Sequence, residues 1–225
     1  MANRLLGLFA VLSLITPTLA TAQDDAEGGE TTTFTAKGKN FEVAVPDALC
    51  LPQTQTDEEA TLLLAALDPD NETSVTMGDC TAFFKHYALI KYPKNLPEVP
   101  FSKPVFLRFL ARSMETEAVK KELDKAKGDA SQDVSEGTNG AVEISQGDIV
   151  FSGSDDECVY LSGQLQVEGF GQTDDMLIAT CMTLVGQIAF AVHTYIDTDR
   201  STDVDGLKNL ARTIATSIAE KPAAE

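Results

Sequence analysis

The sequence predicts an α+β fold, in which an antiparallel sheet built from hairpins carries a long central helix and a C-terminal helix. Alternating apolar residues flank turn residues at several points in the chain, and two other stretches have the spacing of amphipathic helices. The strand-like segments also follow one another closely enough to be hairpin neighbours. Because strands joined as hairpins run antiparallel and few helices remain to cover them, this order is typical of an α+β domain.

The first twenty-two residues have the order of a cleavable secretory signal peptide. Arg4 precedes an apolar run from Leu5 to Ile15, Pro17 follows it, and Ala20 and Ala22 are the small residues that a signal peptidase recognises. A membrane anchor is the alternative, but a spanning helix needs about 20 apolar residues and this run has eleven. We therefore expect cleavage after Ala22, a periplasmic or extracellular location, and no membrane span afterwards.

The remaining chain is long enough for one domain with a sizeable core. Residues 23–33 are polar and acidic and predict a flexible leader, because they bury too little to order themselves. Residues 34–220 are expected to form a single α+β domain, and residues 221–225 a short tail.

The charge of the exported chain argues against nucleic-acid partners. The leader holds one of the 17 basic residues and none of the 35 acidic ones, so the mature chain carries a formal charge of −19. Such a charge repels nucleic-acid phosphates and anionic lipid surfaces. It favours solubility and identifies no partner by itself.

Two hairpins are predicted in the first third of the domain. Phe34–Ala36 and Phe41–Val45 flank Gly38, which suits a tight turn. Thr61–Leu67 and Thr73–Met77 flank a turn of Asp, Pro and Asn residues, and we prefer a second hairpin there. A helix is the alternative for this region, because the preceding segment Thr56-Asp57-Glu58-Glu59 resembles a capping box and periodicity alone does not exclude a helix.

The middle of the chain predicts the long helix. Thr81–Tyr92 fits a helix and a strand about equally, and a proline-rich connector follows it. Ser102 is placed to cap a helix that ends near Lys127-Gly128, and Pro104 suits its first turn. We expect an ion pair between Glu117 and Lys121, and a loop over residues 129–139.

The last third predicts several strands and a closing helix. Met176–Leu184 and Ile188–Ile196 flank Gly186 as a third hairpin, and the final helix begins at a capping box of Thr202 and Asp205. The further strands are Val142–Ser145, Ile149–Ser152 and Cys158–Val167. The inward side of the closing helix is formed by Val204, Leu207, Ala211, Ile214 and Ile218.

This order of elements resembles, at the level of the fold, the PsbP-type domains, which include lumenal photosystem accessory proteins and related bacterial domains. The resemblance rests on Phe41-Glu42-Val43-Ala44-Val45-Pro46-Asp47, the hairpin around Gly186, and the closing helix that ends at Thr216-Ser217-Ile218. It implies a sandwich fold and an accessory or binding role, and it transfers no functional residue. The four cysteines and the proline-rich connector depart from the family pattern.

The four cysteines predict two disulfides. Cys50, Cys80, Cys158 and Cys181 all lie in the mature chain, and an even count in an exported protein is typical of disulfide pairing. Three pairings are possible, and the hairpin order favours Cys50–Cys80 and Cys158–Cys181. A zinc or redox site is not expected, since the chain contains no Cys-x-x-Cys pair.

His193 is the most tempting candidate for a catalytic residue. His193 could act as an acid or base beside Tyr195, but a strand histidine without a catalytic role fits better because no nucleophile motif accompanies it. His86 lies between Lys85 and Tyr87 and is weaker still. The chain lacks Gly-x-Ser-x-Gly, a phosphate-binding glycine loop and His-Glu-x-x-His.

Two acidic runs have incomplete calcium-loop patterns, and turn or capping roles explain them more simply. In the run 197–205, Thr202 and Lys208 stand where a calcium loop needs its Gly and its bidentate Glu. The run 68–72 suits a turn. We therefore expect no metal and no cofactor.

A non-enzymatic exported module that binds a protein or a small ligand is the leading hypothesis from the sequence. The absent catalytic motifs and the fold resemblance support it. The alternative is a hydrolase-type enzyme with dispersed catalytic residues near His193.

Overall fold

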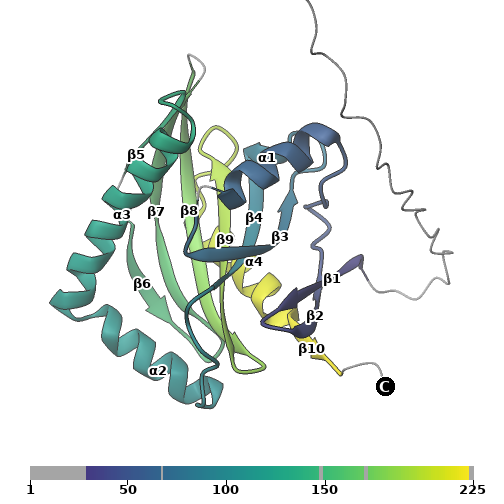
Figure 1. Ribbon diagram of the computed structural model, residues 1–225, viewed down its shortest axis with the longest axis vertical. Coiled ribbons are helices and arrows are strands. Elements are labelled where there is room, and N and C mark those ends of the chain that lie inside the picture. Colours follow the sequence, from purple (N-terminus) through teal and green to yellow (C-terminus); the bar gives the residue numbers. More distant parts are fainter. Residues whose placement is uncertain (1–28, 67, 147–148, 170–171, 223–225) are drawn as a thin grey trace, which may run out of the picture.

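Figure 1 shows the computed structural model of the protein, which describes residues 29–66, 68–146, 149–169 and 172–222. The predicted signal peptide, residues 1–22, lies outside the described residues. None of the helices within these ranges is long and apolar enough to cross a membrane. The elements, in chain order, are β1 (Thr31–Ala36), β2 (Lys39–Ala44), α1 (Gln55–Ala66), β3 (Asn71–Gly78), η1 (Phe83–Lys85), β4 (His86–Pro93), α2 (Lys103–Met114), α3 (Glu117–Gly137), β5 (Val142–Gln146), β6 (Val150–Ser154), β7 (Val159–Gly169), β8 (Gln172–Val185), β9 (Ile188–Asp197), α4 (Val204–Ser217) and β10 (Ala219–Lys221).

Two antiparallel sheets organise the described chain, which confirms the predicted α+β class. The main sheet has the strand order β3-β4-β9-β8-β7-β5, and β6 also pairs with β7. The smaller sheet has the order β1-β2-β10. Helix α4 and the small sheet pack on one face of the main sheet, and α2 and α3 pack on the other face at the β5 and β6 side (Figure 1).

The first predicted hairpin is confirmed. Strands β1 and β2 pair from Thr31 opposite Ala44 to Ala36 opposite Lys39. The turn residues Lys37 and Gly38 both have positive φ, of 50° and 78°, which is the conformation of a tight two-residue hairpin turn. The first strand begins three residues before Phe34, inside the segment predicted as a flexible leader.

The second predicted hairpin, Thr61–Leu67 with Thr73–Met77, is wrong, because residues 61–66 do not form a strand; Leu67 lies outside the described residues. Residues 55–66 form helix α1 instead. The Thr54 hydroxyl accepts a hydrogen bond from the Asp57 N–H, and the Asp57 carboxylate accepts one from the Thr54 N–H. These reciprocal bonds satisfy free N–H groups at the helix start, so a capping box two residues earlier than the predicted one decides the structure of this segment.

The second hairpin is formed by β3 and β4, which resolves the ambiguity of Thr81–Tyr92. A short 3₁₀ turn over Phe83–Lys85 precedes strand β4, and the strand pairs with both β3 and β9. Gly78 ends β3 where a Cβ atom would lie only 2.5 Å from the Phe83 ring. A glycine is needed there because the 3₁₀ turn approaches the strand so closely.

The predicted single central helix is wrong, because the structure has two helices there. Helix α2 ends at Met114 and α3 begins at Glu117, with the Thr116 hydroxyl accepting from the Val119 N–H at the start of α3. Helix α3 then continues to Gly137, so most of the predicted loop 129–139 is helical.

Two predicted details of these helices are also corrected. Ser102 occupies the N-cap position of α2, but its side chain makes no capping hydrogen bond. Glu117 pairs with Lys120, at 2.7 Å between Oε1 and Nζ, rather than with Lys121.

The third hairpin and the closing helix are confirmed. Strands β8 and β9 pair over ten residues, from Met176 opposite Asp197 to Val185 opposite Ile188. Helix α4 is capped by Asp203, whose carboxylate accepts from the Gly206 N–H, rather than by Thr202. The core between α4, the small sheet and the main sheet includes Phe41, Met77, Ile90, Phe190, Val192 and Ile214.

Candidate functional site

His193 lies on the face of the main sheet opposite α4, in the middle of strand β9. It stands between Leu89 of β4 and Thr180 of β8 in the strand register. Its Nδ1 atom is 2.9 Å from the Thr180 hydroxyl oxygen. Burial, and to a lesser degree the positive charge of Lys91, lowers the pKa of His193 to about 4, although Asp68 acts in the opposite direction. The imidazole is therefore neutral at neutral pH.

Tyr195 lies two residues further along β9 and packs as an aromatic core residue. Its ring stacks on Tyr87 with 4.5 Å between ring centroids and 12° between ring planes. Burial, and to a lesser degree Asp68, raises the pKa of Tyr195 above its usual value. Burial raises the pKa of Tyr87 as well. Neither phenol is therefore tuned to lose its proton near neutral pH.

An ion pair of Lys91 and Asp68 accompanies His193, and sequence reasoning missed it. The Lys91 Nζ is 2.7 Å from Asp68 Oδ2, and the Asn71 amide donates to Asp68 Oδ1 at 2.9 Å. Burial raises the pKa of Asp68, but the hydrogen bond and charge of Lys91 outweigh it, so the net pKa lies below the usual value. A lysine inside an apolar strand was the available signal, since such a residue needs a buried carboxylate partner.

These groups do not form a catalytic constellation. An acid–base enzyme needs a group whose pKa is close to the working pH and, for nucleophilic chemistry, an activated hydroxyl or thiol beside it. The pKa of His193 is far below neutral, and its near hydroxyl belongs to Thr180, which is 3% exposed. A buried hydroxyl on the sheet offers no access to a substrate. The arrangement is a set of buried and half-buried side chains that hydrogen-bond to one another on the sheet.

His86 and the acidic runs supply no second site. His86 begins β4 opposite Ile196, its Nε2 is buried without a partner, and burial lowers its pKa. The Asp203 carboxylate caps α4. The Asp197 carboxylate lies 2.5 Å from the Lys85 Nζ, and it also accepts from the Asp199 N–H. Among the described residues, no group of three or more His, Cys, Asp or Glu side chains is arranged to hold a metal ion.

The structure contains two disulfides, Cys50–Cys80 and Cys158–Cys181. These are the two pairs that the order of the hairpins in the sequence favours. The first lies beside the bridge between Cys50 and Gly78. The second ties the start of β7 to β8, and both of its cysteines are fully buried. The described residues contain no free cysteine.

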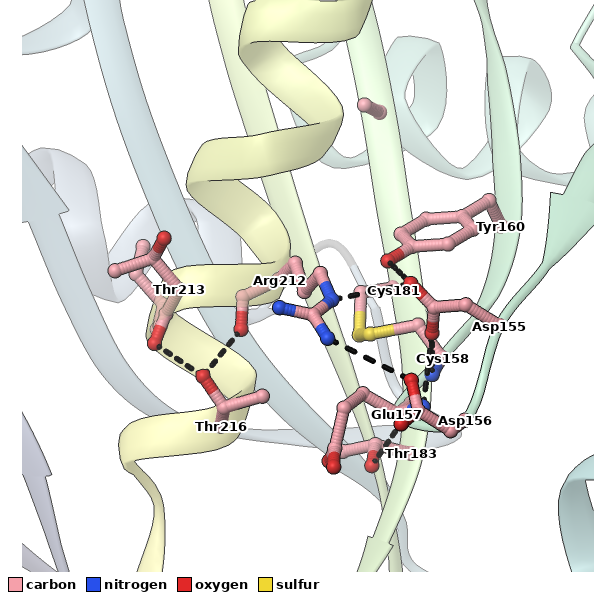
Figure 2. The surroundings of a disulfide bond; sticks show 12 residues. Asp155, Asp156, Glu157, Cys158, Tyr160, Cys181, Thr183, Arg212, Thr213 and Thr216 are labelled. Carbon is pink, nitrogen blue, oxygen red and sulfur yellow. Dashed lines mark hydrogen bonds and ion pairs between the residues drawn. A yellow bond between two sulfur atoms is a disulfide. The ribbon is translucent and has the colours of Figure 1, made fainter. Parts of the chain in front are cut away.

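Figure 2 shows a polar network around the second disulfide. The Asp155 carboxylate accepts from the Tyr160 hydroxyl at 2.7 Å, from the Arg212 Nε at 3.0 Å, and from the N–H groups of Glu157 and Cys158. Burial raises the pKa of Asp155, but these donors outweigh it and leave the pKa below its usual value. Because Arg212 lies on α4, the network joins that helix to the β6–β7 connection and is structural.

A pocket of about 390 Å³ opens between α2, α3 and β6. Apolar side chains and a few charged ones line it: Met114, Glu115, Lys120, Leu123, Asp124, Ile149, Val150 and Phe151. Its volume falls in the range of small-molecule sites, which is roughly 300–1,000 Å³. Sequence reasoning missed this pocket, because it forms where the helix predicted as continuous breaks.

Comparisons with known proteins identify no family. No protein-family model matches the chain, and no curated protein matches it significantly. Among solved structures, the crystal structure of LpqN from Mycobacterium tuberculosis, described as involved in cell envelope biogenesis, is similar at 13% identity and a TM-score of 0.26, over 86% of each chain. A TM-score this low carries no argument about fold or role. None of these comparisons shows the PsbP-type resemblance.

Proposed function

We propose that this protein is an exported, non-enzymatic binding module, periplasmic or secreted, that takes a small apolar ligand into the pocket between α2, α3 and β6. The pocket carries the proposal, because it combines apolar walls and a few charged groups with a ligand-sized volume. We propose in addition that the single domain expected over residues 34–220, extended to Thr31 and Lys221 by strands β1 and β10, acts as one unit, with a PsbP-type accessory role as the model.

The pocket chemistry defines the class of ligand. Leu123, Ile149 and Phe151 contribute apolar walls, which favour a hydrocarbon or aromatic body. Lys120 is paired with Glu117, and that hydrogen bond and charge raise the pKa of Lys120. The lysine therefore stays protonated and partly neutralised, and an uncharged ligand fits better than a strongly ionic one.

Export is supported by two independent features of the chain. The first twenty-two residues match a secretory signal peptide, and two disulfides are typical of proteins that fold in an oxidising compartment. N-terminal sequencing of the native protein tests this part: we expect a chain that begins at Gln23, and a chain recovered with Met1 or Ala2 from the cytoplasm would contradict it.

The ligand proposal is tested with N-phenylnaphthylamine, an uncharged probe that fluoresces strongly in apolar sites. We expect saturable enhancement with the wild-type protein and a loss of about tenfold in affinity for Val150→Asp, because Val150 lines the pocket and is 52% exposed. Leu62→Asp is the matched control, since Leu62 is 70% exposed on α1, and its affinity should be unchanged. Equal binding by both variants and wild type would refute the pocket assignment.

The absence of catalysis has its own test. A screen of ester, amide and phosphate substrates should show no turnover above background. Turnover that disappears in the His193→Ala variant would refute the non-enzymatic assignment and support a hydrolase, whereas the probe experiment does not depend on that result.

A further inference from the structure

Exposed apolar side chains concentrate on and just before helix α2. The six large apolar residues exposed in the described part of the chain are Leu62, Leu96, Phe101, Val105, Phe109 and Val150. Three of them form one row: Phe101 precedes the helix and is 57% exposed, and Val105 and Phe109, one turn apart on it, are 41% and 69% exposed. Rows of exposed aromatic and aliphatic side chains mark interaction surfaces.

Two arginines lie beside this row on the same outward side of α2. Arg108 and Arg112 are also one turn apart, and both side chains are exposed. No carboxylate among the described residues forms an ion pair with either guanidinium. Helix α2 contains no acidic residue, and its other basic residue, Lys103, is paired with Glu157.

The inner side of α2 is already occupied by the core. Leu107 and Met114 are buried against Val159 of the main sheet, so the helix cannot turn its outward row inward. The two rows therefore form a fixed surface that is both apolar and cationic, which we call the α2 outer face: Phe101, Val105, Phe109, Arg108 and Arg112. The positive charge of this face contrasts with the formal charge of −18 of the chain as a whole.

We propose that the α2 outer face docks on an anionic lipid surface. The chemistry of a bilayer interface matches the two rows, since apolar side chains reach the acyl boundary while neighbouring guanidinium groups stay at the level of the phosphates. The face is a row on an outward helix rather than a cleft, which suits a planar lipid surface better than a groove-binding peptide. The surface lies outside the ligand pocket, so this proposal does not rest on the proposed function.

The acidic side chains elsewhere on the molecule weaken the attraction to anionic lipid and influence which surface faces it. Charges further than about 8 Å from the membrane are largely screened at physiological ionic strength, so the groups nearest the lipid decide attraction. Elsewhere the surplus of acidic side chains opposes the approach to an anionic bilayer, so we expect the α2 outer face to make the contact. The overall charge therefore sets the orientation of the bound protein.

Vesicle flotation tests the proposal with the mature chain. We expect binding to vesicles of equimolar phosphatidylglycerol and phosphatidylcholine, and much weaker binding to pure phosphatidylcholine. Substituting Arg108→Gln together with Arg112→Gln should lower the partition coefficient about thirtyfold, from about 1 kcal/mol for each basic group. Substituting Phe101→Ser together with Phe109→Ser should lower it at least about tenfold.

A matched control removes the same charge from a neighbouring helix. Lys121 and Lys125 are exposed, one turn apart on α3. Substituting Lys121→Gln together with Lys125→Gln should change the partition coefficient by less than about threefold, because these groups lie off the contact surface. All variants carry exposed substitutions, and circular dichroism confirms that each is folded before it is assayed.

A fluorescence experiment places the contact surface directly. The chain contains no tryptophan, so a single introduced indole is the only one present. The emission of Phe109→Trp should shift to shorter wavelength on the phosphatidylglycerol vesicles, and that of Leu62→Trp should not. A failure of the wild-type protein to bind, or binding that survives both the arginine and the phenylalanine substitutions, overturns the lipid proposal and assigns this face to a protein partner instead.

Discussion

At the scale of single residues, the middle of the main sheet carries polar groups that are buried or half-buried and paired with one another. His193 is neutral and hydrogen-bonded to Thr180, and the charges of the paired Lys91 and Asp68 both act on its pKa. The position of His193 and Tyr195 on the face away from α4 was predictable from strand alternation alone. The ion pair was not, because Thr81–Tyr92 fitted a helix and a strand equally and the pairing of β3 with β4, which brings Lys91 to the turn at Asp68, was not predicted.

The depressed pKa of His193 predicts a loss of stability in mild acid. The histidine has a folded-state pKa of about 4 against an ordinary value of 6.5, so the unfolded chain takes up a proton first as the pH falls. The free energy of unfolding should therefore drop as the pH falls through this window, by about 2 kcal/mol between about pH 7 and about pH 5.

Urea unfolding of the wild type and of His193→Gln at both pH values measures this effect. The glutamine variant should show a clearly smaller pH difference. Two identical pH dependences would mean that His193 is not the group that titrates. His86→Gln serves as the comparison, because burial also lowers the pKa of His86, although no comparably large shift is expected from it.

Thr76 offers a gain in stability. Its side chain is 5% exposed and its hydroxyl has no hydrogen-bond partner, so the buried oxygen is desolvated without compensation. We expect Thr76→Val to raise the free energy of unfolding by about 1 kcal/mol. Thr194→Val is the matched control and should lower it by about 1 kcal/mol or more, since the Thr194 hydroxyl lies within hydrogen-bond reach of the Ala179 and Leu207 carbonyls. Denaturant titration distinguishes the two signs.

At the scale of elements, the sequence predictions succeed where an element has a periodic apolar pattern, and they fail where a single capping side chain decides where a helix begins. The third hairpin and the closing helix were predictable because strict alternation and a long amphipathic period carry their own signal. Helix α1 and the break between α2 and α3 depend instead on single hydroxyls, those of Thr54 and Thr116. The pocket between α2, α3 and β6 could not be predicted for the same reason, since it forms where the helix breaks.

The cap of α4 can be tested by one pair of substitutions. Asp203 accepts the Gly206 N–H at 2.9 Å, and we expect Asp203→Ala to lower the free energy of unfolding by about 1 kcal/mol. Asp205→Ala removes a carboxylate from the same turn, but this side chain is 89% exposed, so its effect should stay within about 0.5 kcal/mol. Equal effects in thermal or chemical unfolding would mean that charge rather than capping is responsible.

At the scale of the whole molecule, the two disulfides differ in access to solvent. Cys158 and Cys181 are fully buried, whereas Cys80 is exposed. A reductant reaches Cys158–Cys181 only after the sheet opens, but it can attack Cys50–Cys80 in the folded protein.

We therefore expect stepwise reduction. Under native conditions, mild dithiothreitol followed by alkylation and mass spectrometry should label Cys50 and Cys80 first, with Cys158 and Cys181 labelled only when urea is added. Simultaneous labelling of all four cysteines would contradict this order. Removing either disulfide should cost roughly 3 kcal/mol on a chain-entropy model, because the pairs close separations of 30 and 23 residues.

The small sheet has a consequence for the connectivity of the chain. Strand β10, almost the last described segment, pairs with β2, whose other neighbour is β1, almost the first (Figure 1). The first and last strands of the described residues thus lie in one three-stranded sheet, with β2 between them. Because β1 and β10 run parallel on either side of β2, a linker from Lys221 to Thr31 must cross β2 and run back along it, which takes about a dozen residues. With such a linker, new ends could be cut at an outer loop to give a circular permutant.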